Sequence, residues 1–308
     1  MQIAAYDDVK AGVKTRHPPD GGTAWRTDFL RGADGEVGHP MAFLAEGTPH
    51  RVIKPHFHDV DQFQVIVKGG GVIGKHALSL NAVHFSRAHT PYGPLTGDER
   101  GVGFLTLRAT WDPGAQYLHN AESKEKLVKL DSRKPWQVTE APNFDGNADV
   151  NVNTFQAIKD ERGLAAFSIK LAPGATMMSP DITQTNGQYL IVTSGSLNYE
   201  GKDYKAVSIG FSKPSEKQFP IIAGPEGVEA VVLHFPRLET ATKIVPKAAE
   251  PKQYRVWQCL LCSFSYDEAK GMPDEGIAAG TRWEDVPETW ICPDCATSKA
   301  DFDMVVVA

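Results

Sequence analysis

The organisation of this chain is decided by residues 256–295, which read VWQCLLCSFSYDEAKGMPDEGIAAGTRWEDVPETWICPDC. Cys259 and Cys262 form one C-x-x-C pair, and Cys292 and Cys295 form a second. The 29 residues 263–291 separate the two pairs. Each loop carries two thiolates on one turn, so the two loops together can place four sulfurs around one metal. A tetrahedron of four sulfurs selects zinc or iron.

Aromatic residues around the cysteines favour iron. Zinc ribbons usually space their cysteine pairs by about 15–20 residues, and the gap here is longer. A shell of aromatic rings keeps water from the sulfurs, which suits a one-electron site because burial tunes its potential. A zinc site that only fastens the tail remains the alternative. The aromatic residues are Tyr254, Trp257, Phe264, Tyr266, Trp283, Trp290 and Phe302.

The segment resembles a rubredoxin. The resemblance implies a domain over residues 253–308 with a mononuclear Fe(Cys)4 centre on Cys259, Cys262, Cys292 and Cys295 that passes single electrons. The matching motifs are aromatic-x-C-x-x-C (257–262), Y-D (266–267), G-I-x-x-G-T (276–281), W-E-D-x-P (283–287), W-x-C-P-x-C (290–295) and a late Lys-x-x-Phe (299–302). Three positions depart from the pattern. Trp257 replaces the usual Tyr, and Ser263 and Ala296 replace the Gly that usually follows each pair, although Gly accepts a left-handed backbone more readily.

Charge and composition limit the classes of partner. The 308-residue chain has a net charge of −6, and residues 253–308 carry ten acids against four bases, so the rest balances at 28 against 28. Nucleic acid is not expected, because it needs a basic face. The acidic tail suits a basic partner such as an NAD(P)H-dependent rubredoxin reductase. No apolar run approaches the ~20 residues that span a membrane, and all four cysteines lie in the tail, so a cytoplasmic location is expected.

The remainder of the chain predicts β-structure in two similar blocks. Short apolar runs broken by Gly and Pro are typical of the strands of a sandwich or barrel. Residues 62–70 align with 188–196, and 84–95 align with 210–221, both at an offset of 126. Residues 97–108 align with 224–235 at an offset of 127. An internal duplication, giving two β-barrels side by side, explains these offsets.

The first block contains His56-Phe57-His58 followed by Gln62 and Gly69. Alternate side chains of a strand share a face, so His56 and His58 point the same way. The spacing resembles the first motif of the cupins, G-x5-H-x-H-x3–4-E-x6-G, with Gln62 in place of the acidic ligand. The resemblance implies a double-stranded β-helix, or jelly roll, with a second divalent metal (Fe, or alternatively Zn, Mn, Ni or Cu) on His56, His58 and Gln62.

The second cupin motif is less regular. The literal P-x-G of Pro91-Tyr92-Gly93 puts Thr96 in the place of the family's third histidine, and a looser alignment puts Tyr92 there. His84 and His89 are the other candidates for that ligand. If the barrel is an oxygenase, His84, His89 and Tyr92 are expected to line the mouth of the pocket as acid–base or orienting groups. Phe57, Phe63 and Phe85 are expected at its rim. A polar pocket of hydrogen-bonded histidines without metal is the alternative. The equivalent positions in the second block, Ile182 and Gln184, predict a barrel without this chemistry.

These features predict a mainly β chain with two cupin-like barrels and a small rubredoxin-like domain. The expected division is 1–22 lead-in, 23–120 first barrel, 121–150 connector, 151–237 second barrel, 238–252 linker and 253–308 rubredoxin-like domain.

Two functions follow from this organisation. The first is an oxidoreductase, namely an O2-using, metal-dependent cupin oxygenase acting on a small apolar or aromatic substrate and supplied with electrons by its own rubredoxin domain. The tether raises the effective concentration of the donor to roughly millimolar. The second is a non-catalytic, ligand-binding or redox-sensing bicupin with an electron-transfer or structural tail. Monomer and homodimer both stay open.

Overall fold

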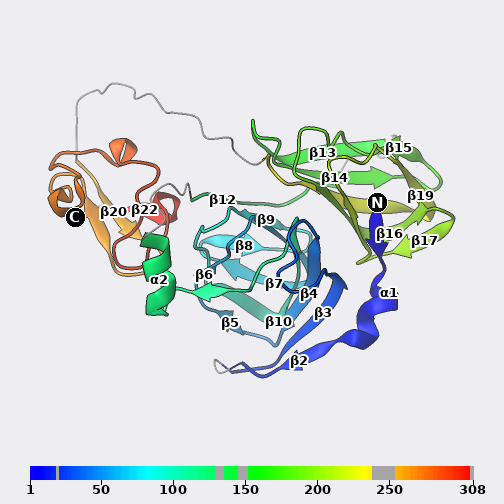
Figure 1. Ribbon diagram of the computed structural model, residues 1–308, viewed down its shortest axis with the longest axis horizontal. Helices are drawn as coiled ribbons and strands as arrows, with labels where there is room; N and C mark the ends of the chain where they lie inside the picture. Colours follow the sequence, from blue (N-terminus) through cyan, green and yellow to red (C-terminus); the bar gives the residue numbers. More distant parts are fainter. Residues whose placement is uncertain (19–20, 129–134, 145–151, 238–253, 306–308) are drawn as a thin grey trace.

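The computed structural model describes the chain except residues 19–20, 129–134, 145–151, 238–253 and 306–308. Two β-barrels lie side by side, and a small third body lies beyond the first of them, next to the helix α2 (Ala121–Val128) (Figure 1). The expected linker 238–252 and parts of the connector 121–150 fall outside the described residues. Among the described helices, none is long and apolar enough to cross a membrane.

The first barrel is built on a nine-stranded antiparallel sheet in the order β12-β9-β7-β10-β4-β3-β2, with β5 paired to β10 and β8 to β7. β6 and β11 form a separate two-stranded sheet beside it. The strands are β2 (Lys14–Arg16), β3 (Ala24–Leu30), β4 (Met41–Gly47), β5 (Val52–Ile53), β6 (His56–Phe57), β7 (Gln62–Ile73), β8 (His76–Leu78), β9 (Val83–Ser86), β10 (Leu95–Arg108), β11 (Gln116–Tyr117) and β12 (Gln137–Glu140).

The second barrel repeats this plan in an eight-stranded sheet in the order β1-β18-β16-β19-β14-β13, with β15 paired to β19 and β17 to β16. β16 spans 188–199 where β7 spans 62–73, and β18 spans 209–212 where β9 spans 83–86, so the offset of 126 is kept. The strands are β1 (Gln2–Ala4), β13 (Val152–Lys159), β14 (Ala165–Leu171), β15 (Thr176–Met178), β16 (Gln188–Tyr199), β17 (Lys202–Lys205), β18 (Ile209–Ser212) and β19 (Pro220–His234).

Two segments expected outside the barrels take part in their sheets. Residues 1–22, expected as a lead-in, contain β1, the helix α1 (Tyr6–Val9), a 3-10 turn (Lys10–Gly12) and β2. β1 pairs with β18 of the second barrel, and β2 pairs with β3 of the first. β12, from the expected connector, pairs with β9. These pairings join residues far apart in sequence, for which no local pattern gives a signal.

Both faces of β7 are buried, because one faces the interior of the first barrel and the other faces the second barrel. Phe63 and Val65 belong to an apolar core that both barrels share. The ring centroids of Phe63 and Phe85 lie 4.9 Å apart, and those of Phe63 and Phe235 lie 5.0 Å apart. Gln62 and Gln64 alternate with them and face the other way, as period-two strands require. The expectation that Phe63 and Phe85 line the pocket rim is therefore wrong.

The third body is a three-stranded sheet in the order β21-β20-β22 with three short 3-10 turns. Its core holds three of the four cysteines together with Tyr266, Trp283, Trp290 and Phe302. Trp257, which departs from the rubredoxin pattern, stacks on Trp283 at 5.2 Å and donates its indole N–H to Glu268. Its elements are β20 (Val256–Cys259), β21 (Ser265–Asp267), β22 (Phe302–Val305) and the turns Pro273–Glu275, Trp283–Asp285 and Lys299–Asp301.

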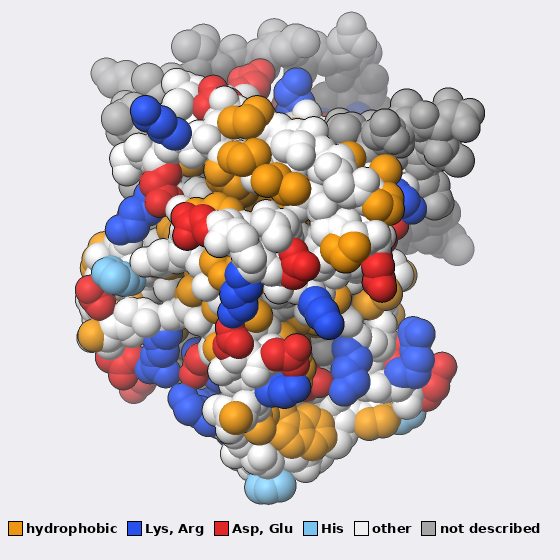
Figure 2. Space-filling view, turned by 90° about the vertical axis from the view of Figure 1, so that its right-hand side faces the viewer, with side chains coloured by type: hydrophobic (Ala, Val, Ile, Leu, Met, Phe, Trp, Pro, Cys, Tyr) orange, Lys and Arg blue, Asp and Glu red, His pale blue; other side chains and the backbone are white. Residues whose placement is uncertain are grey.

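The side of the molecule formed by the second barrel carries acidic and basic side chains that are interspersed (Figure 2). No large area of a single sign appears on this face. A mixed surface of this kind gives no electrostatic footprint for a phosphate backbone.

Candidate functional site: an iron centre beside a polar barrel pocket

The two C-x-x-C loops bring their four sulfurs together. The Sγ atoms of Cys259 and Cys295 lie 3.6 Å apart, as do those of Cys262 and Cys292. All four ligand atoms lie within 4.8 Å of one another. A metal bound tetrahedrally at about 2.3 Å from each sulfur requires sulfur–sulfur distances of about 3.8 Å. The four cysteines therefore fit one metal ion.

The surroundings of the sulfurs are those of a dry site. Cys259, Cys292 and Cys295 are buried, and Cys262 is partly exposed. Trp283 and Trp290 lie in the same core, with their ring centroids 5.6 Å apart. Three sulfurs are thus shielded by the domain core, and the Cys262 side is the most accessible to an outside partner.

Glu268 holds the aromatic shell in place. Its carboxylate has 0% side-chain exposure and accepts hydrogen bonds from the backbone N–H of Trp283 at 3.0 Å and the indole of Trp257 at 3.0 Å. Arg255 and Arg282 form ion pairs with it, each at 3.1 Å. Although burial raises the pKa of this carboxyl, these hydrogen bonds lower it to about 2. Glu268 is therefore a fixed buried anion that orders both tryptophans.

The second site lies in the first barrel, where His56, His58, Gln62 and Tyr92 converge on a cavity of about 370 Å³. Each is less than 10% exposed. His56 comes from β6, Gln62 begins β7, and Tyr92 is bridged to His56 through the backbone. The structure thus brings together the three predicted metal ligands and one of the predicted pocket residues.

Tyr92 occupies the place that the looser cupin alignment gives to the third ligand. Its hydroxyl lies 3.0 Å from His56 Nε2 and accepts a hydrogen bond from Gln62 Nε2 at 2.7 Å. Burial raises the pKa of Tyr92 above its usual value, so the phenol keeps its proton and donates it to His56. His56 Nδ1 lies 2.8 Å from the Lys54 carbonyl oxygen and is therefore assigned as its N–H side. Burial lowers the pKa of His56 to about 3, so the ring is neutral.

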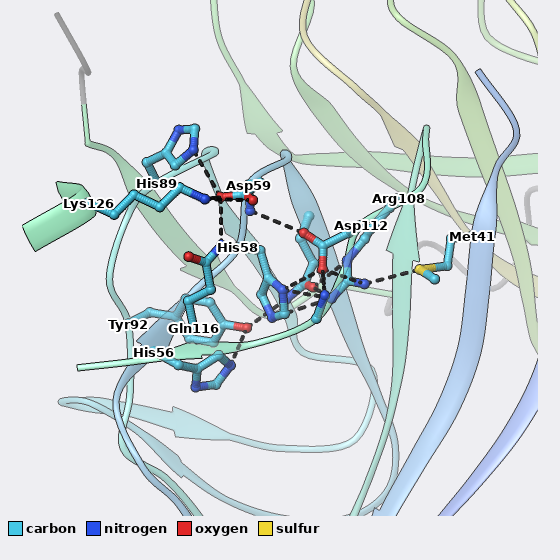
Figure 3. Close-up of polar contacts among 12 residues, drawn as sticks. Met41, His56, His58, Asp59, His89, Tyr92, Arg108, Asp112, Gln116 and Lys126 are labelled. Carbon is cyan, nitrogen blue, oxygen red and sulfur yellow. Dashed lines mark hydrogen bonds and ion pairs between the residues drawn. The ribbon is translucent and has the colours of Figure 1, made fainter. Parts of the chain in front are cut away.

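Arg108 and Asp112 complete the pocket, and the sequence prediction missed both (Figure 3). The Arg108 guanidinium is 3% exposed and donates to Gln62 Oε1, from Nε at 2.9 Å and from Nη2 at 2.5 Å. Its Nη2 also lies 3.3 Å from His58 Nε2, and its Nη1 lies 3.2 Å from Asp112. His58 Nδ1 donates to Asp112 at 2.9 Å. Period-two alternation from Phe104 and Thr106 would have placed Arg108 on the inner face of its strand.

This donor set does not fit a divalent metal well. The lone pair of His56 Nε2 accepts from Tyr92, and the oxygen of Gln62 accepts from Arg108. A guanidinium beside both Gln62 and His58 repels a second cation, and Asp112 already serves Arg108 and His58. Within the described residues, only the four cysteines form a group of three or more His, Cys, Asp or Glu suited to a metal. Of the two interpretations of the sequence, these contacts favour the hydrogen-bonded pocket, and a metal on His56, His58 and Gln62 stays a prediction.

Other predicted residues lie elsewhere. His84 is 2% exposed, lies behind Tyr92 with ring centroids 5.1 Å apart, and bonds Thr139 through Nδ1 at 2.8 Å, but it is outside the cavity lining. His89 also lies outside the lining and contacts Asp59 at 3.1 Å. Phe57 is fully buried on the side facing the iron-binding domain rather than at the pocket rim. Thr96 lies on β10, so the literal second-motif alignment does not place it in the site.

The two sites are joined by a packed contact. Ala296, which follows Cys295, is buried in one apolar cluster with Phe57, Leu118 and Leu127. Phe57 is the residue between His56 and His58. The loop of Cys292 and Cys295 therefore shares a buried apolar cluster with the segment that carries both pocket histidines.

Polar contacts surround this cluster. Lys124 of α2 donates to the carbonyl of Asp294 at 2.6 Å, Gln137 of β12 donates to Asp301 at 2.5 Å, and Lys75 pairs with Asp303 at 2.9 Å. Figure 3 shows that Lys126 of α2 also reaches Asp59, whose backbone N–H bonds Asp112 at 3.1 Å. The helix α2 thus contacts both the iron-binding domain and the network around the pocket.

Comparison with known proteins agrees with this picture. The rubredoxin family profile matches residues 256–302. Rubredoxin-2 of Pseudomonas aeruginosa is 61% identical over 54 residues, which is 18% of this chain and 98% of that protein. Rubredoxin-1 of the same organism is 65% identical over 51 residues, covering 17% of this chain and 93% of that protein.

Most of the chain is also similar in fold to a candidate dioxygenase from Nostoc punctiforme. The TM-score is 0.52 at 14% sequence identity, and the alignment covers 81% of this chain and 87% of that one. At this identity the similarity shows the two-barrel fold alone. The four-sulfur site in a rubredoxin domain indicates iron, which makes the protein a metal-dependent redox protein. The chain belongs to the rubredoxin family through its C-terminal domain, which it joins to two β-barrels of similar plan.

Proposed function

We propose that the protein is an oxidoreductase in which the rubredoxin domain exchanges single electrons with a small molecule held in the pocket of the first barrel. The observation that carries the proposal is the buried cluster that Ala296 shares with Phe57. When bound, iron in the four-cysteine site supplies reversible one-electron exchange.

The contact gives a short route between the two sites. Ala296 is bonded to Cys295, and Phe57 is bonded to both His56 and His58. Ala296 and Phe57 are members of one buried cluster with Leu118 and Leu127, so packed side chains fill the space between these two chain segments. Electron tunnelling weakens steeply with the width of a through-space gap, so a packed cluster favours transfer between the domains.

The residues of the contact also keep water out. Phe57 and Leu127 are fully buried, and Leu118 is 5% exposed. The pocket side of the strand, by contrast, carries neutral groups that can hold or move a proton, since Tyr92 O–H donates to His56 Nε2. The arrangement separates an apolar path for electrons from a polar network for protons.

The other cysteine pair is suited to receive electrons from outside. Cys262 is partly exposed and Ser263 is exposed, whereas Cys295 is buried in the domain core and Ala296 is buried in a cluster with residues of the first barrel. A rubredoxin domain implies an electron-transfer chain with a reductase as partner. The net charge of −6 on residues 253–308 suits a basic docking face on an NAD(P)H-dependent reductase.

The version of this function that the sequence suggests is an O2-using oxygenase with a metal on His56 and His58. It accounts for the need for an electron donor, and metal analysis of the intact protein tests it. The second candidate is a ligand-binding redox sensor, which the guanidinium of Arg108 beside Gln62 and His58 favours.

Reoxidation kinetics test the proposal. The full-length protein is reduced without oxygen, a candidate substrate is added, and the visible ferric-thiolate absorption is followed after O2 is admitted. An oxidoreductase predicts faster reoxidation with the substrate and a converted product, and the Phe57→Leu variant should slow it. A sensor predicts a ligand-dependent spectral or affinity change without product. Equal reoxidation of the wild type and Phe57→Leu with every ligand that binds the pocket would contradict electron exchange through this contact.

A further inference from the structure

The inner part of the pocket contains a buried polar group without a partner. Gln64 lies on β7, is 4% exposed and lines the cavity. Its Oε1 makes no hydrogen bond within the described part of the chain. Its paired neighbours are His84 on β9 and Thr106 on β10. Buried amide oxygens are seldom left unpaired, so this oxygen calls for a hydrogen-bond donor from a ligand.

His84 adds a second unpaired atom at the same level of the barrel. Its Nε2 has no partner among the described residues, while Nδ1 is held by Thr139. The ring is neutral, because burial lowers the pKa of His84 to about 3. The two unpaired atoms thus belong to neutral side chains, Gln64 in the lining and His84 behind it, and they favour a neutral hydroxyl over an ionised group at this position.

The mouth of the pocket has the opposite character. Arg16, Arg26 and Arg31 line it. Arg26 pairs with Asp28 at 2.6 Å, and Arg31 pairs with Asp34. Arg16 forms no ion pair with any residue that the structure describes. Three arginines against two carboxylates leave one positive charge at the mouth, and an anionic group on the ligand would compensate it.

The walls between mouth and inner end are aromatic. Phe43, Trp111 and Tyr117 line the cavity, and the Arg26 guanidinium stacks 3.7 Å above the ring of Phe43. Flat aromatic walls favour a planar ring. A cavity of about 370 Å³ is at the small end of the range for ligand sites, so the ring carries few substituents.

We propose that the pocket binds a small aromatic hydroxy acid, with its hydroxyl donating to Gln64 Oε1 and its carboxylate at Arg16 in the mouth. This substrate class deepens the proposed oxidoreductase function and rests on it for the redox role. Binding itself can be measured without turnover.

Three probes separate the two anchors. 4-Hydroxybenzoate carries both groups, benzoate lacks the hydroxyl, and phenol lacks the carboxylate. Isothermal titration calorimetry on the full-length, iron-loaded protein should show 4-hydroxybenzoate binding roughly five- to tenfold more tightly than either of the others, the amount expected for one hydrogen bond or one partly exposed ion pair. Equal affinities for 4-hydroxybenzoate and benzoate, or no binding of any probe, would overturn the assignment.

Variants then assign each anchor to a residue. Gln64→Leu copies Leu190, the residue at the same position of the second barrel. This variant should lower the affinity for 4-hydroxybenzoate to that for benzoate and leave the affinity for benzoate unchanged. Arg16→Gln should lower the affinities for 4-hydroxybenzoate and benzoate by about the same factor and leave the affinity for phenol unchanged. The matched control is Gln188→Leu, the same change on the equivalent strand of the second barrel, which should alter none of the three.

Folding of each variant is checked by the ferric-thiolate absorption and circular dichroism. If Gln64→Leu does not fold, Gln64→Asn keeps an amide but withdraws it from the ligand, and it should reduce the preference for 4-hydroxybenzoate over benzoate at least threefold. An unchanged preference in a folded variant contradicts the role of Gln64. Tight binding of 4-hydroxybenzoate without any effect on the reoxidation rate would contradict the proposed function but not this ligand assignment. Faster reoxidation only with ligands of another class would contradict the ligand assignment but not the proposed function.

Discussion

Ala296, the residue after the last iron-binding cysteine, is packed in the same buried cluster as Phe57, the residue between the two pocket histidines. Ala296 has a left-handed backbone with φ of 57°. An alanine in this conformation costs roughly 1–2 kcal/mol relative to glycine, which rubredoxins usually have here. Its methyl group adds to the buried cluster of Phe57, Leu118 and Leu127, which a glycine could not do, so docking to the barrel explains this departure from the family pattern.

The Ala296→Gly variant tests this explanation. We expect the iron-binding domain to become more stable by about 1 kcal/mol, because the backbone strain is relieved, while its contact with the barrel weakens. Thermal loss of the ferric-thiolate absorption measures the first effect, and the reoxidation rate with a bound ligand measures the second. Ser263→Gly is the matched control, since Ser263 follows the other cysteine pair, is exposed and does not have a positive φ. A slower reoxidation in Ser263→Gly than in Ala296→Gly would contradict the account.

Arg108 can be tested as the reason for the poor fit to a metal. The wild type should keep close to one metal per chain after desalting, because the guanidinium opposes a second cation. The double variant Gln62→Glu, Arg108→His supplies a carboxylate and removes that charge, and histidine is the residue that pairs with Gln188, the counterpart of Gln62, in the second barrel. We expect it to retain about two metals per chain by mass spectrometry. A second metal in the wild type that is lost in a His56→Ala, His58→Ala variant would show that Arg108 does not exclude it.

Glu268 should be the most sensitive acid of the iron-binding domain. Because its pKa is lowered to about 2 from an ordinary 4.5, the stability it contributes is complete above pH 4.5 and is lost as the pH falls toward 2. Glu268→Gln leaves Arg255 and Arg282 without this buried charge, so we expect a loss of about 3–5 kcal/mol at pH 7 and a flatter dependence on acid. The rate of iron release to a chelator, followed between pH 2 and 7, measures both the loss of stability at pH 7 and its dependence on acid.

The matched control for this variant is Glu284→Gln. Glu284 is 60% exposed and pairs with the same Arg255, so it should cost less than about 1 kcal/mol. Similar rates of iron release in the two variants would mean that burial of Glu268 is not what matters.

The buried histidines of the first barrel predict a second dependence on pH. Burial lowers the pKa of His56 and of His84 to about 3, whereas in the unfolded chain it is near 6.5. The unfolded state therefore binds more protons between these values, and the free energy of unfolding falls by about 1.4 kcal/mol per pH unit for each histidine as the pH drops from 6.5. The free energy of unfolding, measured with urea at pH 4–7, should depend less steeply on pH in His84→Gln than in His119→Gln, the control at an exposed position. Identical slopes would contradict neutral burial of His84.

Local sequence patterns could predict the four cysteines, the two similar barrels and the convergence of His56, His58 and Gln62. The cysteines and histidines are visible through the short spacings C-x-x-C and H-x-H. The two barrels are visible through a sequence repeat at an offset of 126, which β7 and β16 keep. Such spacings are set by the geometry of a turn or a strand, so they are visible in the chain itself.

The rest depends on contacts between distant residues. The pairing of β1 with β18, the closure of Arg108 on Gln62 and the packing of Ala296 on Phe57 each join residues at least 46 positions apart. Alternation from Thr106 places Arg108 on the inner face of its strand. Nothing in the local sequence, however, indicates that its guanidinium reaches Gln62 in a pocket. His89 has the residue type of a pocket acid–base group, but its strained turn directs it to Asp59 instead.

The most direct test of the account is the distance between the iron and the pocket histidines. With 15N-labelled histidine, nuclear relaxation of His56 and His58 is compared in the iron-loaded protein and in the same protein loaded with diamagnetic zinc. The account predicts strongly enhanced relaxation of both rings with iron, and little change for His234 in the second barrel. Equal relaxation of His56 and His58 with iron and with zinc would show that the iron centre does not lie against this strand in solution.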